Sequence, residues 1–334
     1  MKLLLTFLAT ALVLLSAEFK PVMIYDSELL KDDSWNSMIH DGIERFKNRF
    51  NVDIKEVKVL DIKDFDKEIR KLAEAGYDPI MVNDVDDIKE LAIKKTTLDY
   101  PKKRFIIFNG TINIPNADFF VFSYQEATFL AGYLAAKKSK TNTIGFVGGM
   151  EIPVIKNFLC GYIKGAKYAN PDAKVFYEFI GQDFNAWNNP KKGYDLAKKQ
   201  ILNGADVVFG PAGGSSLGIL KAAHDLKKLG IGVDRNQNGY FPGSVLTSVM
   251  VRVDNAAYMA LTTAYKGIWR DNIKIMGLQE KGLKLTFDKY NESLISTKLR
   301  EELDKISADI ILKKIKLPNY TQTKECSYKG EKIF

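Results

Sequence analysis

Three polar residues, Asp26, Asn109 and Asp234, come directly after short apolar runs that are typical of buried β-strands. In a parallel sheet such residues lie at the carboxyl ends of the strands, where open α/β sheets bind their ligands. A carboxylate accepts hydrogen bonds, whereas a carboxamide both donates and accepts them. We therefore predict that these three side chains contact a small ligand. For Asp234, capping of a turn is the alternative role.

Glycines follow these runs too, notably in the segment Gly213-Gly214-Ser215-Ser216 before a predicted helix. The backbone N–H groups at a helix start could hold an anion or a hydroxyl-rich ligand. The segment lacks the lysine of a phosphate-binding loop and the spacing of a dinucleotide fingerprint. Two roles for Gly213 stay open, contact with a ligand and a tight strand-to-helix turn.

Aromatic residues stand beside the same loops. Trp35 and Phe209 lie next to predicted strand ends, and Phe184 lies in a loop before Pro190. A flat ring at such a position can stack on a heterocyclic ligand, or it can belong to the core. Both roles stay open for Trp35 and Phe209, and Phe184 is the weaker candidate for contact with a ligand.

Metal and nucleophile chemistry has little support in this composition. The chain has two histidines, His40 and His224, and two cysteines, Cys160 and Cys326. We expect that these four residues do not assemble a four-ligand zinc site of the cysteine and histidine type, so a metalloenzyme of that type is not predicted. A disulfide between the cysteines is compatible with the sequence but not required by it. We predict no metal, no cofactor and no catalytic residue.

One segment resembles a calcium loop. Residues 234–239, Asp-Arg-Asn-Gln-Asn-Gly, fit the first six positions of an EF-hand. The twelfth position, which requires a bidentate glutamate, is Val245. We therefore predict that this loop does not bind calcium.

Composition and charge restrict the class of protein. The chain has 334 residues, 46% of them hydrophobic and 27% charged, which excludes intrinsic disorder and a multi-span membrane protein. The length fits two domains. The net charge is +8, but the lysines occur in pairs such as Lys94-Lys95 and lie near acidic or apolar neighbours. This pattern is typical of solvated helix faces, so we predict no nucleic-acid partner.

The N-terminus has the pattern of an export signal. Lys2 is followed by the apolar run Leu3–Leu15 and then by Ser16-Ala17, so residues 1–17 are predicted to be a signal peptide. A signal segment that is retained in the membrane is the alternative. Glu18 stands where a bacterial lipoprotein would carry its acylated cysteine, so lipidation is not expected there. The expected location is the cell envelope, outside the cytoplasm.

Short apolar runs alternate with helical patterns along the chain. The first series covers residues 21–108, and the second covers residues 125–233. Near-continuous apolar strands that alternate with helices predict parallel sheets covered on both faces. We predict an α/β protein with two such lobes.

Several stretches of this chain together resemble the basic membrane protein family, exported substrate-binding proteins of ABC transporters related to bacterial purine nucleoside receptors. The resemblance runs from about Pro21 to Lys316. It is carried by residues 26–36, 126–136, 144–150, 161–171, 204–214, 231–237 and 246–249.

The resemblance implies a type I periplasmic-binding-protein fold, in which two Rossmann-like lobes are joined by a multi-strand hinge. The N-terminal lobe would comprise residues 20–122 and about 250–275. The C-terminal lobe would comprise residues 123–249 and about 276–320, and residues 321–334 would form a tail. The ligand would lie in the cleft between the lobes.

By the same resemblance, Trp35 and Phe209 would stack on opposite faces of a purine ring. Asp26 and Asn109 would contact the base, and Asp234 would contact the ribose. Asn36, Phe184, Gly213 and Arg252 complete the predicted set of ligand-binding residues. The family commonly has phenylalanine at Trp35, an acidic residue at Asn109, and a lysine at Val251, next to Arg252.

The function implied is capture of a purine nucleoside (adenosine, guanosine or inosine) and its delivery to an ABC permease, without catalysis. The protein is expected to be a monomer that reaches the membrane through the permease or a retained signal segment. Two alternatives stay open: a surface adhesin with a diverged cleft, and a nucleoside hydrolase that uses Asp26 and Asp234.

Overall fold

The computed structural model describes residues 19–25, 34–83, 87–326 and 330–332. The predicted signal peptide, Glu18 and Asp26 lie outside the described residues. The chain divides into two compact units. The first contains Asn36–Phe122, Val253–Ile275 and the described residues before Lys31. The second contains Ser123–Arg252, Met276–Phe334 and the short segment that ends at Trp35.

A six-stranded sheet forms the centre of the first unit, in the order β11-β5-β4-β3-β1-β2. Strand β1 pairs with β2 and β3, β3 pairs with β4, and β4 pairs with β5, and all of these pairs are parallel. Its central strands are buried apolar runs, as expected for a sheet covered on both faces. The strands are β1 (Val22–Tyr25), β2 (Lys55–Lys58), β3 (Ile80–Asn83), β4 (Phe105–Phe108), β5 (Ala117–Phe122) and β11 (Ile273–Met276).

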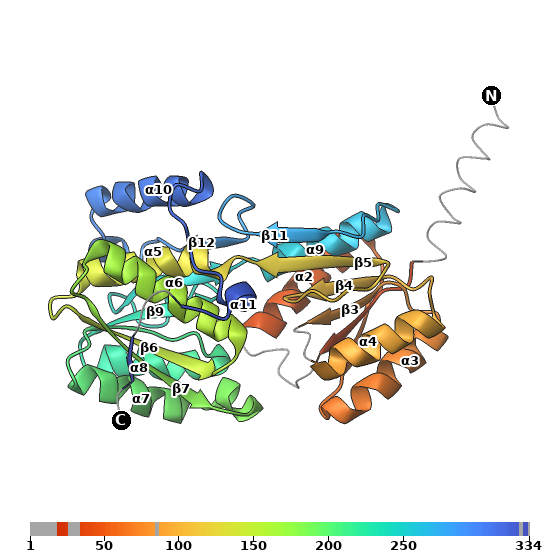
Figure 1. Ribbon diagram of the computed structural model, residues 1–334, viewed down its shortest axis with the longest axis horizontal. Coiled ribbons are helices and arrows are strands. Elements are labelled where there is room, and N and C mark those ends of the chain that lie inside the picture. The colour runs from red at the N-terminus through yellow and green to blue at the C-terminus, as the bar shows by residue number, and fades with distance from the viewer. Residues whose placement is uncertain (1–18, 26–33, 84–86, 327–329, 333–334) are drawn as a thin grey trace. The chain divides into compact units, whose positions relative to one another are not determined.

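Four helices cover the two faces of this sheet (Figure 1). They are α2 (Trp35–Phe50), α3 (Phe65–Glu74), α4 (Asp87–Asp99) and α9 (Val253–Tyr265). Ile80 and Val82 of β3 share a core cluster with residues of α3 and α4. Because successive side chains of a strand alternate between faces, Met81 and Asn83 point to the face of α2. The contact between Asn83 and Asn36 of α2 agrees with this assignment.

The second unit has a seven-stranded sheet in the order β12-β10-β9-β8-β6-β7-β13. Among the strand pairings described in this sheet, only that of β10 with β12 is antiparallel. The strands are β6 (Thr143–Met150), β7 (Lys174–Gly181), β8 (Val207–Phe209), β9 (Leu229–Asp234), β10 (Val245–Val251), β12 (Leu283–Leu285) and β13 (Glu331–Lys332).

Helices α7 (Pro190–Leu202) and α8 (Ser216–Asp225) pack on one face of this sheet, and α5 (Tyr124–Lys138) and α6 (Pro153–Ala169) pack on the other. Glycines bring α5 and α6 close together. A Cβ on Gly132 would lie 1.9 Å from the carbonyl oxygen of Tyr162, and one on Gly165 would lie 1.9 Å from that of Phe129. The two helix backbones therefore touch at positions that tolerate no side chain.

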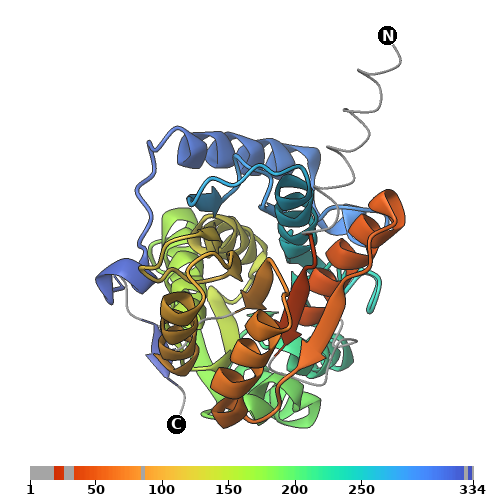
Figure 2. The same cartoon turned by 90° about the vertical axis from the view of Figure 1, so that its right-hand side faces the viewer.

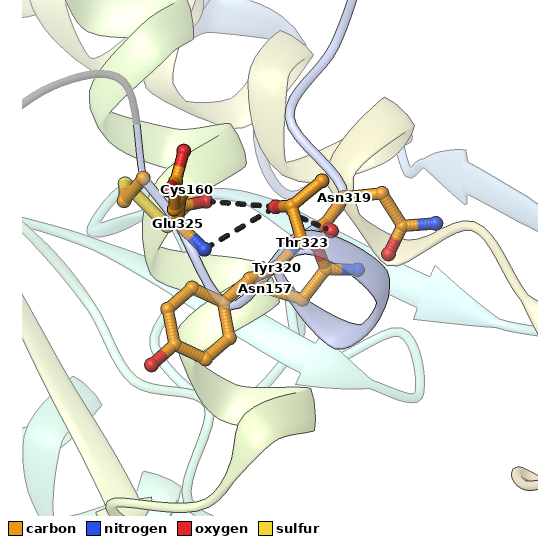
Figure 3. The surroundings of a disulfide bond; sticks show 7 residues. Asn157, Cys160, Asn319, Tyr320, Thr323 and Glu325 are labelled. Carbon is orange, nitrogen blue, oxygen red and sulfur yellow. Dashed lines mark hydrogen bonds between the residues drawn. A yellow bond between two sulfur atoms is a disulfide. The ribbon is translucent and has the colours of Figure 1, made fainter.

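The segment after α10 (Thr297–Ile311), called the tail from here on, runs past α11 (Tyr320–Thr323) to β13, which pairs with β7 (Figure 2). A disulfide between Cys160 of α6 and Cys326 fixes the tail to the second unit. Beside it, the backbone N–H of Tyr320 donates to Oδ1 of Asn157 at 2.9 Å (Figure 3). The disulfide that the sequence left open is therefore formed.

The predicted fold class, an α/β protein with two mostly parallel sheets, is confirmed. Strand β5 and helix α9 were not predicted, and β10 was not placed as an element. Strands β5 and β10 pair with β4 and β9, the strands that precede them in the chain. Helix α9 contacts α2 through Asn255 and Arg45, which are 210 positions apart, and a contact between such distant residues leaves no local pattern in the sequence. None of the helices within the described ranges is long and apolar enough to cross a membrane.

Candidate functional site

Three asparagines, Asn36, Asn83 and Asn109, belong to elements that meet at the carboxyl edge of the first sheet. Asn83 is the last residue of β3 and pairs with Phe108, the last residue of β4. Asn109 follows β4 with φ 61°, and its N–H donates to the carbonyl of Phe120 at 2.8 Å. Asn36, in the first turn of α2, accepts a hydrogen bond of 2.9 Å from Nδ2 of Asn83. Among the described residues, this edge therefore carries amides, which can both donate and accept hydrogen bonds.

A buried lysine, Lys89, lies next to these amides. Lys89 of α4 is 2% exposed, and its Nζ donates to the carbonyl oxygen of Asn83 at 3.0 Å. This bond holds the end of β3 against α4.

Trp35 is the first residue of α2 and is partly exposed. The residue before it, Ser34, is buried and donates a hydrogen bond from its hydroxyl to the carboxylate of Asp234. Ser34 and Asp234 both belong to the second unit. The predicted aromatic platform thus adjoins a residue that holds the predicted ribose-binding carboxylate.

Asp234 ends β9 in a left-handed conformation, with φ 63°. The turn after it is held by side chains, because Oε1 of Gln237 accepts from the N–H of Val233 at 3.0 Å. The N–H of Gln237 in turn donates to Oγ of Ser248 at 2.9 Å. The backbone at Asp234 is therefore fixed by β9 and β10, which a ligand-contacting carboxylate requires.

The segment that resembles a calcium loop is closed by hydrogen bonds. Nδ2 of Asn236 and Nδ2 of Asn238 both donate to Asp288, at 2.7 and 3.0 Å. Burial opposes the negative charge of Asp288, but these bonds and the N–H of Tyr290 outweigh it and lower the pKa of that carboxyl. The two amides therefore present N–H groups, and not oxygen ligands, to the carboxylate. A role in turn structure accounts for this segment.

Gly213 also has a structural role. Its φ is +56°, a conformation that favours glycine, and a Cβ there would lie 3.2 Å from the carbonyl oxygen of Trp187. The ring of Trp187 lies so close to Gly149 that a Cβ on that residue would be 2.2 Å from it. Gly149 near the end of β6 and Gly213 in the segment after β8 thus make room for a tryptophan of this chain.

Phe209 packs among aromatic residues of the second unit. Phe209 is fully buried, and its ring centroid lies 5.4 Å from that of Tyr162 and 5.7 Å from that of Phe146. Val208 points toward α7 and α8, so the next residue of the strand must point into the opposite core. In this structure the ring is enclosed by core neighbours, and its predicted contact with a ligand stays a prediction.

The remaining predicted residues lie at the surface or at a strand end. Phe184 begins a short 3-10 helix, η2 (Phe184–Asn188), and is 60% exposed. Arg252 directly follows β10 and is partly exposed, and its N–H donates to the carbonyl oxygen of Gly282 at 2.8 Å. The structure does not bring Phe184 together with another predicted residue through any contact among the described residues.

One group of side chains in the described part of the chain has the residue types of a metal site. Ligand atoms of His40, Glu44 and Glu56 lie within 4.8 Å of one another. His40 is already bonded to Glu56 at 3.0 Å, and Tyr25 donates to the same carboxylate at 2.7 Å. Lys47 pairs with Glu44 at 2.8 Å. These ion pairs and hydrogen bonds account for the group without a metal.

The sequence analysis missed Asn83, Ser34 and the position of Trp187. Asn83 ends an apolar run just as Asn109 follows one, so the same rule would have found it. Ser34 lies in the stretch 26–36 that carries the resemblance, but it was not singled out, because serine before a helix is an ordinary N-terminal residue. Gly148-Gly149 and Gly213-Gly214 flank Trp187 in the sequence, but a pair of glycines does not reveal which side chain packs against it.

The chain is similar in sequence to proteins of a known family. A sequence model of the family described as "ABC transporter substrate-binding protein PnrA-like" matches residues 19–320. Basic membrane protein A of Borreliella burgdorferi is 29% identical over 93% of this chain and 91% of its own length. Basic membrane protein B of the same organism is 31% identical over 79% of this chain and 80% of its own length.

Solved structures support the fold. A solute-binding protein of an ABC transporter system from Aeropyrum pernix K1 has a TM-score of 0.80 at 22% identity, over 90% of this chain and 93% of that one. A similar protein from Conexibacter woesei has a TM-score of 0.71 at 19% identity, over 90% and 99% of the two chains. At such identities the likeness establishes the architecture alone.

Proposed function

Because the chain belongs to the family of PnrA-like ABC transporter substrate-binding proteins, we propose that it captures a purine nucleoside and delivers it to an ABC permease. The family consists of substrate-binding proteins and not of enzymes. The observation that carries the choice of ligand is the set of uncharged amides at the end of the first sheet, next to the start of α2 at Trp35. A neutral, flat, hydrogen-bonding ligand suits such a set.

In this proposal Trp35 stacks on the purine, while Asn36 and Asn109 contact its edge with Asp26. An aromatic face contributes about 1–3 kcal/mol per base and does not demand a particular base. Asp234 accepts hydrogen bonds from the ribose hydroxyls, since a carboxylate has two acceptor oxygens for two vicinal hydroxyls. Gly213 and Arg252 lie in the second unit, as Asp234 does. Phe209 is not assigned a stacking face.

We propose that the protein acts outside the cytoplasm. The disulfide between Cys160 and Cys326 supports this location, because such bonds persist in oxidising compartments. The pattern of residues 1–17 also supports it. A relative from Pyrococcus horikoshii is named an uncharacterized lipoprotein. In the present chain Glu18 stands at the expected lipidation position, so attachment by that route is not proposed.

Isothermal titration calorimetry of the protein against nucleosides, free bases and free sugars tests the ligand class. We expect adenosine, guanosine or inosine to bind, ribose to give no heat, and free bases to bind more weakly because they cannot reach Asp234. Absence of binding by every nucleoside at millimolar concentration would contradict the proposal and favour the adhesin. Steady release of free base, followed by chromatography, would instead indicate the hydrolase.

A further inference from the structure

The side-chain oxygen of Asn83 is buried at the carboxyl end of a central strand without a hydrogen-bond partner. Asn83 is 1% exposed, and its Oδ1 has no partner among the described residues. A buried polar atom without a partner is uncommon in folded proteins and needs an explanation. Its own Nδ2 does have a partner, Oδ1 of Asn36, at 2.9 Å. The amide is therefore oriented by one hydrogen bond from its donor, while its buried acceptor has no partner among the described residues.

The topology places Asn83 between two predicted ligand contacts. Strand β3 lies between β1 and β4 in the sheet. Asp26 follows β1 in the sequence, and Asn109 follows β4. The register pairs Asn83 with Phe108, the residue before Asn109. Any ligand that touches the ends of β1 and β4 must therefore pass the end of β3.

Two further contacts hold this residue in place. Lys89 binds its carbonyl oxygen at 3.0 Å, and the neighbouring strands fix its backbone. Asn36, which accepts from Asn83, is 9% exposed and belongs to the predicted binding set. A hydrogen-bonding group that is held so firmly loses little conformational entropy when a ligand binds.

We infer that Asn83 determines specificity, because its Oδ1 accepts a hydrogen bond from an N–H group on the edge of the bound purine. This inference rests on the proposed function and extends it from the ligand class to the edge that is recognised. Ring N–H and exocyclic amino groups of inosine, adenosine or guanosine can supply the donor. Purine riboside carries no N–H group on its ring system and cannot. A site with a buried acceptor rejects the ligand that leaves the acceptor unpaired.

The test is the ratio of two dissociation constants, that of purine riboside and that of the tightest of the three donor-bearing nucleosides. Calorimetry of the unaltered chain should give a ratio of about five or more. In Asn83→Leu, which removes the acceptor, the ratio should fall toward one. Met81→Leu is the matched control, because Met81 is buried on the same face of the same strand and has no hydrogen-bonding group comparable to an amide. It should keep the ratio of the unaltered chain.

A structural role for Asn83 alone would weaken both ligands equally and leave the ratio unchanged in Asn83→Leu. That result, or a ratio near one in the unaltered chain, overturns the inference while the proposed function stands. Failure of the unaltered chain to bind any nucleoside overturns both. If Asn83→Leu does not fold, Asn83→Ala carries the same test, since it adds no volume.

Discussion

Cys160 and Cys326 join helix α6 to the C-terminal tail across 166 residues of sequence, with their Cα atoms 5.5 Å apart. The tail also donates from the N–H of Tyr320 to Asn157 and adds β13 beside β7. Strand β7 would otherwise be the edge of the sheet, and an open edge invites pairing with other chains. The disulfide thus holds a segment that protects the sheet.

We expect the variant with Cys160→Ser and Cys326→Ser to unfold more readily than the parent. A crosslink that closes a long loop typically stabilises a protein by about 2–4 kcal/mol. Urea unfolding should show a loss in that range, and hydrogen exchange should be faster at residues 320–326 and in β7. Ser296→Ala removes the N-terminal cap of α10 and should itself cost about 0.5–2 kcal/mol. It is therefore a control for destabilisation outside the tail and should leave exchange in β7 unchanged. Equal exchange in β7 with and without the disulfide would contradict this role of the tail.

The close contact of α5 and α6 gives a second prediction. In Gly132→Ala the new Cβ would lie 1.9 Å from the carbonyl oxygen of Tyr162, so one helix must move. We expect a loss of about 2 kcal/mol or more in the free energy of unfolding, as for other overpacked sites. This outcome opposes helix propensity, which favours alanine by about 1 kcal/mol.

Gly243→Ala is the matched control for that variant. Gly243 has a φ of +75°, but no atom lies within 4 Å of the position of a new Cβ. The substitution strains the backbone without a clash and should cost about 1 kcal/mol. Thermal or urea unfolding of both variants compares the two costs. If Gly132→Ala were no less stable than Gly243→Ala, the two helices would not be in the close contact described.

The third prediction concerns Trp35. Trp35→Ala should weaken nucleoside binding at least about tenfold, because one stacking face is lost. Calorimetry measures the change, and Trp269→Ala is the control. Trp269 is also partly exposed, but it lies against Arg104 and donates to Asp271. Unchanged affinity in Trp35→Ala would place the stacking face on another residue.

Sequence patterns predicted the alternating strands and helices because each buried element carries its own apolar period. They predicted Asn109 and Asp234 at strand ends for the same reason, and the structure places both there. They could not assign Phe209, because an apolar run that is buried on both faces does not reveal which face its last residue occupies. The second core, between the sheet and α6, occupies that face.

The pairing of Asn83 with Asn36 could not be predicted either. The two residues are 47 positions apart, and only the packing of α2 on the sheet brings their amides together. The tail posed the same difficulty, since its partners lie in α6 and β7. Long-range contacts of this kind are decided by tertiary packing and leave no local period in the sequence.

The last prediction is a dependence of stability on pH at Asp288. Hydrogen bonds from Asn236, Tyr290 and Asn238 lower the pKa of this carboxyl in the folded protein, although burial opposes them. A lowered folded-state pKa contributes stability above the ordinary pKa of 3.8, and that contribution is lost as the pH falls through the folded-state value. At pH 7, Asp288→Asn should therefore cost roughly 1 kcal/mol in the free energy of unfolding.

Urea unfolding at a series of pH values between about 6 and 2 measures this effect. The stability difference between the parent and Asp288→Asn should shrink as the medium becomes more acidic, because protonated Asp288 and asparagine then carry the same charge. Glu301→Gln on the exposed side of α10 is the control and should show no such convergence. A difference that stayed constant across the series would mean that the carboxylate charge of Asp288 does not hold the turn at Asn236 and Asn238.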